Sequence, residues 1–253
     1  MRSRRALVTA AASGLAAGIA AALARDDFAR VAITYRTTPP QATLAAIRSA
    51  GAEASAYRVD FSRAQPEVAA ALDEIVASAG PFDTLVHCVG PIVVKRFASL
   101  DADECREMIA GNLESAIIAA RAVLPAMREA RFGRIVFFGA NGSSETRPAR
   151  GFTVYGAAKS GVTAFARALA LEEARSAITV NVVEPGHIRD TSLTRERAAT
   201  LPAENPRGRP GSFEDVADVV RFLAARERDF VTGAVVGVTG GLFEADERNA
   251  SSS

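Results

Sequence analysis

Short apolar runs rich in valine, isoleucine and phenylalanine alternate along this chain with longer runs in which apolar residues recur at helical spacing. The short runs predict seven strands, at Arg4–Ala10, Arg30–Arg36, Ala54–Asp60, Phe82–Gly90, Gly133–Ala140, Ile178–Gly186 and Gly233–Gly241. The longer runs predict helices near Gly14–Asp27, Gln41–Ala50, Gln65–Ala79, Asp101–Ala130, Val154–Ala174 and Phe213–Ala225. Because continuous apolar strands separated by helices are typical of parallel sheets, we expect one such sheet with helices on both faces.

The order of these elements predicts the fold class. Strands that alternate with helices through right-handed crossovers give a doubly wound, Rossmann-like α/β domain with seven parallel strands. The 253 residues contain no long linker rich in Pro, Gly or Ser, so we expect a single domain at 1–243 and a flexible C-terminal tail at 244–253. Ligands bind such sheets beyond the carboxyl ends of the strands, so the site residues should follow the strands.

Composition and charge narrow the function class. The formal net charge is +1, and no block of basic residues favours a nucleic-acid partner. Cys88 and Cys105 form no disulfide framework, which is typical of a reducing compartment, and we predict a cytoplasmic protein. Two histidines without a Cys/His cluster argue against a metal site.

The uncharged stretch Ala6–Ala24 follows the basic start MRSRR, so it also has features of an export leader or a membrane span. It is mostly alanine, which is weakly hydrophobic, and cleavage after it would remove the first predicted strand and its helix. We therefore predict that it belongs to the domain and that the protein has no membrane partner. The alternative, an exported protein, predicts a mature N-terminus near Arg25.

The sequence TAAASGLAAG joins the first predicted strand to the first helix, where a phosphate can bind free N–H groups at the helix N-terminus. Gly14 is at the spacing of a dinucleotide-binding turn, but Ala10 and Ala16 replace glycines. We expect both alanines to have negative φ, because alanine resists positive φ. If they hinder the cofactor, Ala16→Gly should strengthen NADPH binding. The other interpretation is an alanine-rich core helix.

Two further features indicate nicotinamide chemistry. Arg36 ends the second predicted strand, where no Asp or Glu stands, and an arginine there accommodates the 2′-phosphate of NADP. Tyr155 and Lys159 are four residues apart on a predicted helix and therefore share one face. An ammonium beside the phenol should lower the pKa of the tyrosine and make it a usable general acid or base.

The ordered motifs of the chain resemble the short-chain dehydrogenase/reductase family, in particular its 3-oxoacyl-carrier-protein reductases, over nearly the whole length. TAAASGLA resembles the family's TGxxxGxG turn, VDFS resembles the segment whose Asp contacts the adenine, and HCVG resembles NNAG. GNLES matches the family's helix asparagine, YGAAKSG its Tyr-Lys pair, and NVVEPGHI the stretch that flanks the nicotinamide.

The resemblance implies an NAD(P)H-dependent oxidoreductase, with NADP(H) favoured over NAD(H), that acts on a small carbonyl compound or secondary alcohol. Tyr155 would be the general acid or base, Lys159 would bind the nicotinamide ribose, and Asn112 would hold a water that relays protons. The implied cofactor-binding residues are Thr9, Ser13, Gly14, Leu15, Arg36, Asp60, Phe61, Gly90, Tyr155, Lys159, Pro185, Gly186 and Ile188. The family also implies a homotetramer or homodimer, often with the helices at 101–130 and 154–174 in the interface.

The family's catalytic serine, which polarises the substrate carbonyl, has no direct counterpart. Alignment from the fifth strand places Ala140 there, and counting thirteen residues back from the tyrosine places Gly142 there. We take Ser143 as the candidate catalytic serine, with Ser144 and the amide of Asn141 as alternatives. Both serines could instead be turn residues.

These departures keep a second function open. The altered turn and the missing serine favour a catalytically impaired dinucleotide-binding sensor on the same fold, whereas Tyr155, Lys159 and Asn112 favour an enzyme. His87 stands where the family usually has Asn, and it is either a replacement donor or a buried, hydrogen-bonded histidine. We favour the buried histidine.

Overall fold

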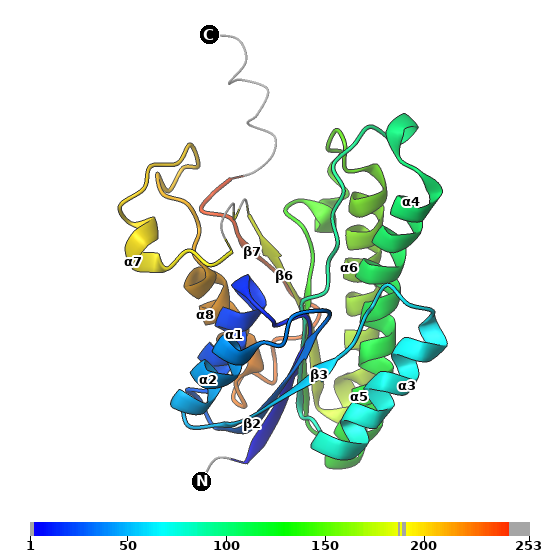
Figure 1. The fold of residues 1–253 in the computed structure, drawn as a ribbon, viewed down its shortest axis with the longest axis vertical. Helices are drawn as coiled ribbons and strands as arrows, with labels where there is room; N and C mark the ends of the chain where they lie inside the picture. The colour runs from blue at the N-terminus through cyan, green and yellow to red at the C-terminus, as the bar shows by residue number, and fades with distance from the viewer. Residues whose placement is uncertain (1–2, 187, 189–190, 243–253) are drawn as a thin grey trace.

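The computed structural model describes residues 3–186, 188 and 191–242, and these form the predicted architecture (Figure 1). A single sheet has the strand order β3-β2-β1-β4-β5-β6-β7, and every neighbouring pair is parallel. The strands are β1 (Arg4–Val8), β2 (Phe28–Tyr35), β3 (Glu53–Arg58), β4 (Thr84–His87), β5 (Gly133–Phe138), β6 (Ile178–Pro185) and β7 (Val235–Val238). From β1 the strands are added toward one edge of the sheet up to β3, and from β4 onward they are added toward the other edge. The switch point therefore lies between β1 and β4, and doubly wound sheets bind ligands at this point.

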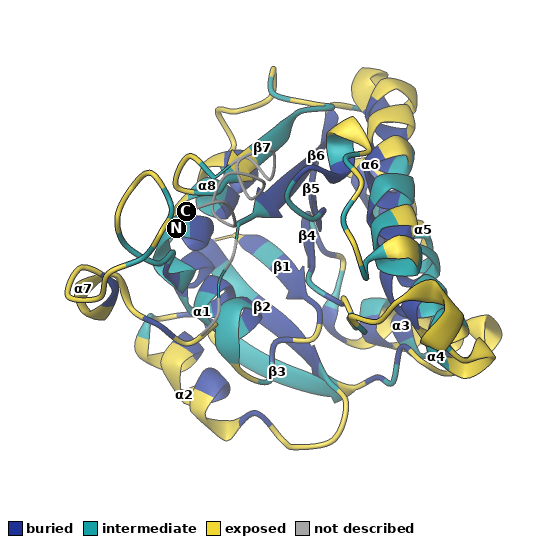
Figure 2. Cartoon of the chain, turned by 90° about the horizontal axis from the view of Figure 1, so that it is seen from above, coloured by how far each residue is buried: buried dark blue, intermediate teal, exposed yellow. Residues whose placement is uncertain are grey.

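Helices cover both faces of the sheet, as Figures 1 and 2 show. One face carries α1 (Gly14–Leu23), α2 (Gln41–Ser49) and α8 (Phe213–Ala224), and the other carries α3 (Gln65–Ala79), α5 (Ser115–Ala130) and α6 (Thr153–Glu173). Two shorter helices, α4 (Ala102–Ile109) and α7 (Arg195–Ala198), lie near the carboxyl ends of the strands. Each face of the sheet has its own hydrophobic core cluster, so the strands are buried on both sides, as their continuous apolar sequence predicts.

The N-terminal stretch is built into the centre of the sheet. β1 pairs with β2 on one side and β4 on the other, and Ala6–Ala24 forms the rest of β1, a turn and α1. The guanidinium of Arg4 is buried, lies 4.3 Å from the centroid of the Phe28 ring and donates to Asp83 at 3.1 Å. The charge of Arg4 is therefore paired inside the domain. The prediction that the N-terminal stretch belongs to the fold is confirmed.

Gly18 serves packing between two helices. A Cβ added to Gly18 would lie 2.3 Å from Cδ2 of Phe213, the first residue of α8. The absence of a side chain lets α1 and α8 approach closely over the sheet. This close approach, one helical turn beyond Gly14, accounts for the glycine.

The helical region predicted at Asp101–Ala130 is interrupted. Asp101 caps α4 in a capping box with Glu104, and a π-helical turn at Ala110–Glu114 separates α4 from α5. Asn112 Nδ2 donates to the carbonyl of Met108, and Ser115 Oγ donates to the carbonyl of Gly111, so side chains take over part of the helical ladder. Such π-turns occur frequently at functional sites.

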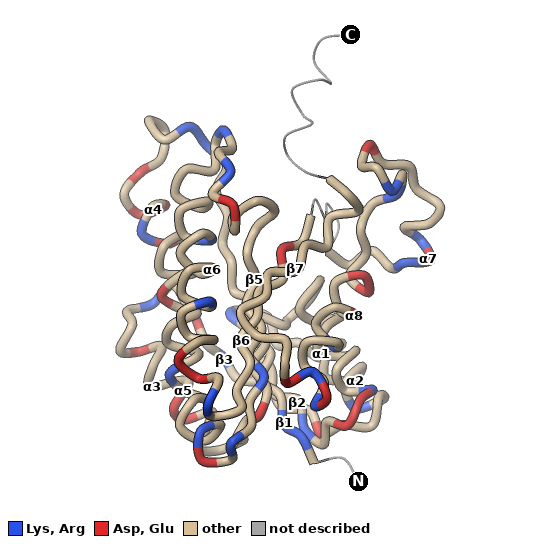
Figure 3. The backbone as a smooth tube through the Cα atoms, turned by 180° about the vertical axis from the view of Figure 1, so that it is seen from behind, with Lys and Arg blue, Asp and Glu red and all other residues tan. Residues whose placement is uncertain are grey.

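The combined helix Ala102–Ala130 has the length and the mean hydropathy, 1.2, of a candidate membrane span, but half of its apolar window is buried inside the domain. Core helices of globular proteins give the same pattern. Acidic and basic residues are interspersed along the chain (Figure 3), and many are paired, as Arg221 is with Asp26. The predicted tail, 244–253, lies outside the described residues.

Candidate active site

The turn between β1 and α1 differs from the prediction at one alanine. Ala10 has a φ of +54°, so the expectation of a negative φ there is wrong, whereas Ala16 lies inside the regular helix. Two hydrogen bonds to β2 hold the turn, since the Ala10 N–H donates to Thr34 Oγ1 and the Ala11 N–H donates to Thr34 O, both at 2.9 Å. These bonds offset the conformational cost that an L-residue meets at positive φ.

The N-terminus of α1 is suited to a phosphate. Ser13 is the N-cap but its side chain makes no capping bond, and the first turn holds no acidic residue. Gly14 has a φ of +63°, and a Cβ added to it would lie 2.4 Å from Thr191 Oγ1. Leu15 packs partly buried against the core cluster beneath. Among the described residues, neither a side-chain cap nor an acidic residue of the first turn neutralises this helix N-terminus, which is the arrangement that binds anions.

A buried hydrogen-bond chain lies below this turn. Thr9 is fully buried; its Oγ1 accepts from the Cys88 N–H at 2.9 Å and lies 3.1 Å from His87 Nδ1. His87 Nε2 lies 2.9 Å from Ser115 Oγ, which donates to the Gly111 carbonyl. The donors and acceptors balance with His87 neutral and its proton on Nε2. Burial lowers the pKa of His87 to about 3. The prediction of a buried, hydrogen-bonded histidine is confirmed, and the Thr9 hydroxyl joins β1 to β4 below the surface of the turn.

Two predicted residues, Asn112 and Lys159, meet beside Gly90, just beyond β4. A Cβ added to Gly90 would lie 3.2 Å from both Asn112 Oδ1 and Lys159 Nζ, so only a glycine leaves this space free. Asn112 is buried; its Nδ2 donates to Pro91 O at 2.8 Å, while its Oδ1 has no hydrogen-bond partner among the described residues. Lys159 Nζ donates to Phe138 O at 2.9 Å. The fold thus brings an unused acceptor and a buried ammonium to one point.

Tyr155 and Lys159 share one face of α6, and the Lys159 Nζ lies 5.7 Å from the centroid of the Tyr155 ring. Burial raises the pKa of Tyr155 to about 12 and lowers the pKa of Lys159 to about 8. The predicted lowering of the tyrosine pKa is therefore wrong in this structure, because desolvation of the phenolate outweighs the ammonium. At neutral pH the phenol keeps its proton.

Hydrogen bonds to β6 and to the loop backbone hold the side chain of Ser143 in the loop after β5. The Ser143 hydroxyl donates to Glu184 Oε1 at 2.8 Å and accepts from the Ala140 N–H at 3.1 Å. Asn141 Nδ2 donates to Leu242 O at 3.3 Å. Sequence reasoning missed Glu184, although a carboxylate directly before the Pro-Gly of the predicted cofactor stretch was a visible signal.

The residues expected at the adenine end lie at the ends of β2 and β3. Arg36 is 63% exposed and forms a long ion pair of 3.8 Å with Glu107. Asp60 accepts from the backbone and the hydroxyl of Ser62, and these bonds, the hydroxyl's first, lower its pKa despite some burial. Phe61 is buried against the His87 ring, so its side chain belongs to the core.

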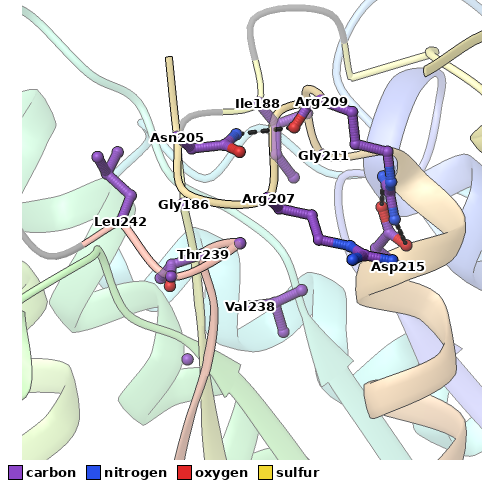
Figure 4. Close-up of a pocket in the computed structure, with 13 residues that line it drawn as sticks. Gly186, Ile188, Asn205, Arg207, Arg209, Gly211, Asp215, Val238, Thr239 and Leu242 are labelled. Atoms are coloured by element: carbon purple, nitrogen blue, oxygen red, sulfur yellow. Dashed lines mark hydrogen bonds and ion pairs between the residues drawn. The ribbon is translucent and has the colours of Figure 1, made fainter. Parts of the chain in front are cut away.

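A cavity of about 350 Å³ adjoins the end of β6 (Figure 4). Gly186 and Ile188, which follow Pro185, line one side, and the segment at 205–211 and the end of β7 line the others. Arg209 donates to both carboxylate oxygens of Asp215 across one wall. The sequence indicated the Pro-Gly stretch but gave no sign of this cavity, because its walls come from three separate segments.

Comparisons with known proteins agree with this geometry. The family model for short chain dehydrogenases matches residues 4–202. The chain is 34% identical over 251 residues to the 3-oxoacyl-[acyl-carrier-protein] reductase FabG of Pseudomonas aeruginosa, covering 96% of this chain and 98% of the relative. The solved structure of acetoin dehydrogenase from Enterobacter cloacae matches with a TM-score of 0.86 at 26% identity, covering 98% of each chain. A 3-oxoacyl (acyl-carrier-protein) reductase from Agrobacterium tumefaciens C58 with NADP bound matches with a TM-score of 0.85 at 26% identity, covering 95% of each chain. This chain therefore belongs to the short-chain dehydrogenase family of oxidoreductases, in the group similar to 3-oxoacyl-carrier-protein reductases.

Proposed function

We propose that the protein is an NADP(H)-dependent oxidoreductase that interconverts a small carbonyl compound and its secondary alcohol, with Tyr155 as general acid and base. The observation that carries the proposal is the convergence beside Gly90, where Lys159 Nζ and Asn112 Oδ1 flank one space and the Tyr155 ring lies next to the same ammonium. These groups lie at the carboxyl ends of the strands, on the edge of the sheet that also carries the N-terminus of α1.

The cofactor fits the described residues. The uncapped N-terminus of α1, with Ser13 and Gly14, would hold the pyrophosphate, and Arg36 at the end of β2 would face a 2′-phosphate. Asp60 would contact the adenine. The NADP bound to the Agrobacterium relative supports this choice of cofactor. When bound, the nicotinamide supplies or accepts the hydride.

The chain's own residues handle the proton. Tyr155 would donate its phenolic proton to the carbonyl oxygen during reduction, and its raised pKa keeps that proton in place until the oxygen becomes basic. Lys159 would bind the nicotinamide ribose, and its buried charge would favour the phenolate left behind. The unused Oδ1 of Asn112 would hold a water that returns a proton toward Lys159. Ser143 would polarise the carbonyl.

Names of the relatives suggest the substrate class. They include a reductase of 3-oxoacyl thioesters and an acetoin dehydrogenase, which share a ketone or secondary alcohol as the reacting group. We propose such a small molecule for this chain, and an assembly of two or four copies through the outer faces of α5 and α6. Cys88 and Cys105 are both free thiols, and we propose the reducing cytoplasm as the compartment.

The test is Tyr155→Phe, with Tyr57→Phe as the matched control, because Tyr57 is partly buried and lies on β3, the edge strand of the sheet. We expect Tyr155→Phe to lose about 100- to 10,000-fold in kcat on a panel of ketones and alcohols, while NADPH binding and Tm are kept. Tyr57→Phe should keep its activity. Full activity of Tyr155→Phe would refute the mechanism, and NADPH binding without turnover of any panel member would refute the enzyme.

A further inference from the structure

A buried carboxylate lies under the loop that follows β5. Glu184 stands directly before the Pro-Gly that ends β6 and is only 5% exposed. Its Oε1 accepts from Ser143 Oγ and from the Ser144 N–H, both at 2.8 Å, and its Oε2 accepts from the Gly142 N–H at 3.2 Å. Among the described residues, every hydrogen-bond donor to this carboxylate comes from these three consecutive loop positions.

The fit around this carboxylate is close. A Cβ added to Gly139 would lie 2.9 Å from both Glu184 Cγ and Ser143 Oγ, so no side chain fits between β5 and the pair. A buried carboxylate is strongly unfavourable unless donors surround it, and here two backbone N–H groups and a hydroxyl do so. Such an arrangement holds the loop in one conformation.

We propose that Glu184 is a positioning residue for the reaction: it holds Ser143 at the carbonyl-binding place that the family's serine occupies elsewhere. The inference rests on the proposed function. The Ala140 N–H fixes the same oxygen from the other side, at 3.1 Å. The Ser143 carbonyl accepts from Ser160 Oγ at 2.9 Å, and Ser160 directly follows Lys159 on α6. Glu184 therefore connects β6 through Ser143 to the helix that carries the proton-transfer residues.

In this role the hydroxyl would act through its single proton. Ser143 has one proton, which it gives to Glu184, and rotation about its Cβ–Oγ bond would redirect this proton to a substrate carbonyl. The oxygen itself stays in place because Ala140 still donates to it. Glu184 remains bonded to the N–H groups of Ser144 and Gly142, so the loop does not have to move. No covalent bond forms or breaks in this step.

Graded variants of Glu184 test the proposal. In Glu184→Gln the amide oxygen can still accept from Ser143 and Ser144, but the amide nitrogen faces the Gly142 N–H. We expect kcat to fall by about 10-fold in Glu184→Gln and by about 100-fold in Glu184→Ala, with KM and the NADPH Kd within about threefold of wild type. Glu173→Gln is the matched control, since Glu173 is equally buried and binds Arg128 at the far end of α6. It should lower Tm and leave kcat unchanged.

A double-variant cycle shows whether the two residues act together. Ser143→Ala should lose about as much kcat as Glu184→Ala, and the double variant should lose no more than the larger single loss. Two losses that multiply would overturn the proposal, and so would wild-type kcat in Glu184→Ala. A fall in Tm without a fall in kcat would assign Glu184 to stability alone.

Failure of the proposed function would be visible separately. Full activity of Tyr155→Phe would refute that function whatever Glu184 does, whereas an inactive Tyr155→Phe with an active Glu184→Ala would refute only the positioning role. Amide hydrogen exchange gives a readout without turnover. The N–H groups of Gly142 and Ser144 should be protected in the wild type and exchange at least about 10-fold faster in Glu184→Ala. Unchanged exchange would overturn the role of the carboxylate in holding the loop.

Discussion

Ala10 offers a direct test of backbone strain in the turn between β1 and α1. It is exposed and has a φ of +54°, a conformation that costs an L-residue roughly 1–2 kcal/mol and glycine almost nothing. Ala10→Gly removes this strain but adds about 0.4–1 kcal/mol of unfolded-state entropy. Because the exposed methyl contributes little packing, the net expectation is a stabilisation of roughly 0.5–1 kcal/mol.

Ala16→Gly is the matched control, because it is the same substitution in the same strand–turn–helix unit at a position with regular helical conformation. Ala16 lies inside α1, is 6% exposed and has no strain to relieve. Glycine there costs about 1 kcal/mol of helix propensity, and the lost burial of the methyl costs about 0.8 kcal/mol. We expect a destabilisation of roughly 1.5–2 kcal/mol.

Urea denaturation followed by circular dichroism measures both variants against the wild type. For a chain of this length, 1 kcal/mol corresponds to a shift in Tm of about 2–4 °C, so thermal melts should show opposite shifts for the two variants. NADPH titration should give Ala10→Gly an affinity within about threefold of wild type, because Thr34 already holds the turn. A destabilised Ala10→Gly would refute the strain argument. Tighter NADPH binding by Ala16→Gly would show that the alanine at position 16, and not the strain at Ala10, limits the affinity for NADPH.

Three further predictions follow from single contacts. Arg36→Ala should weaken NADPH binding by about 10-fold or more and leave NADH binding within about twofold, because only NADPH carries the 2′-phosphate; equal losses by calorimetric titration would contradict the assignment. Gly18→Ala should destabilise the domain by about 1–3 kcal/mol in urea, because its Cβ would lie 2.3 Å from the Phe213 ring; an unchanged midpoint would show that α1 and α8 separate easily. His87 has a pKa of about 3 in the folded protein and about 6.5 in the unfolded chain. Its burial as the neutral form therefore costs no stability above pH 6.5. As the pH falls from 6.5 toward 3, the unfolded chain gains a proton first, and the free energy of unfolding decreases by about 1.4 kcal/mol per pH unit. Paired denaturation series should show a shallower acid slope for His87→Asn, and parallel slopes would count against the buried neutral histidine.

The architecture was predictable because each element has a strong local signal. Every predicted strand overlaps an observed one, since continuous apolar runs of this length suit strands buried on both faces. The π-turn at Ala110–Glu114 was not predictable, because the apolar pattern runs through it unbroken. It depends on Asn112 and Ser115 bonding to backbone carbonyls, and on His87 reaching Ser115 from another element. Local sequence cannot specify contacts of that kind.

The site residues also differ in how much of their role the sequence predicts. Tyr155 and Lys159 were predictable as partners because helical spacing alone places them on one face, but the direction of the tyrosine pKa was not. A charge argument considers the ammonium only, whereas burial acts on the phenol and the ammonium together.

Ser143 shows why the chemistry of a loop needs the fold. A serine hydroxyl has one proton, so its role depends on the acceptor that the proton meets. That acceptor is Glu184, which lies on β6, 41 positions further along the chain. Two features of the sequence depart from the family pattern and look unrelated: the serine lies at position 143 and not at 140, and a carboxylate precedes the Pro-Gly. In the fold they are one contact, and this is why the effects of removing either group should not multiply.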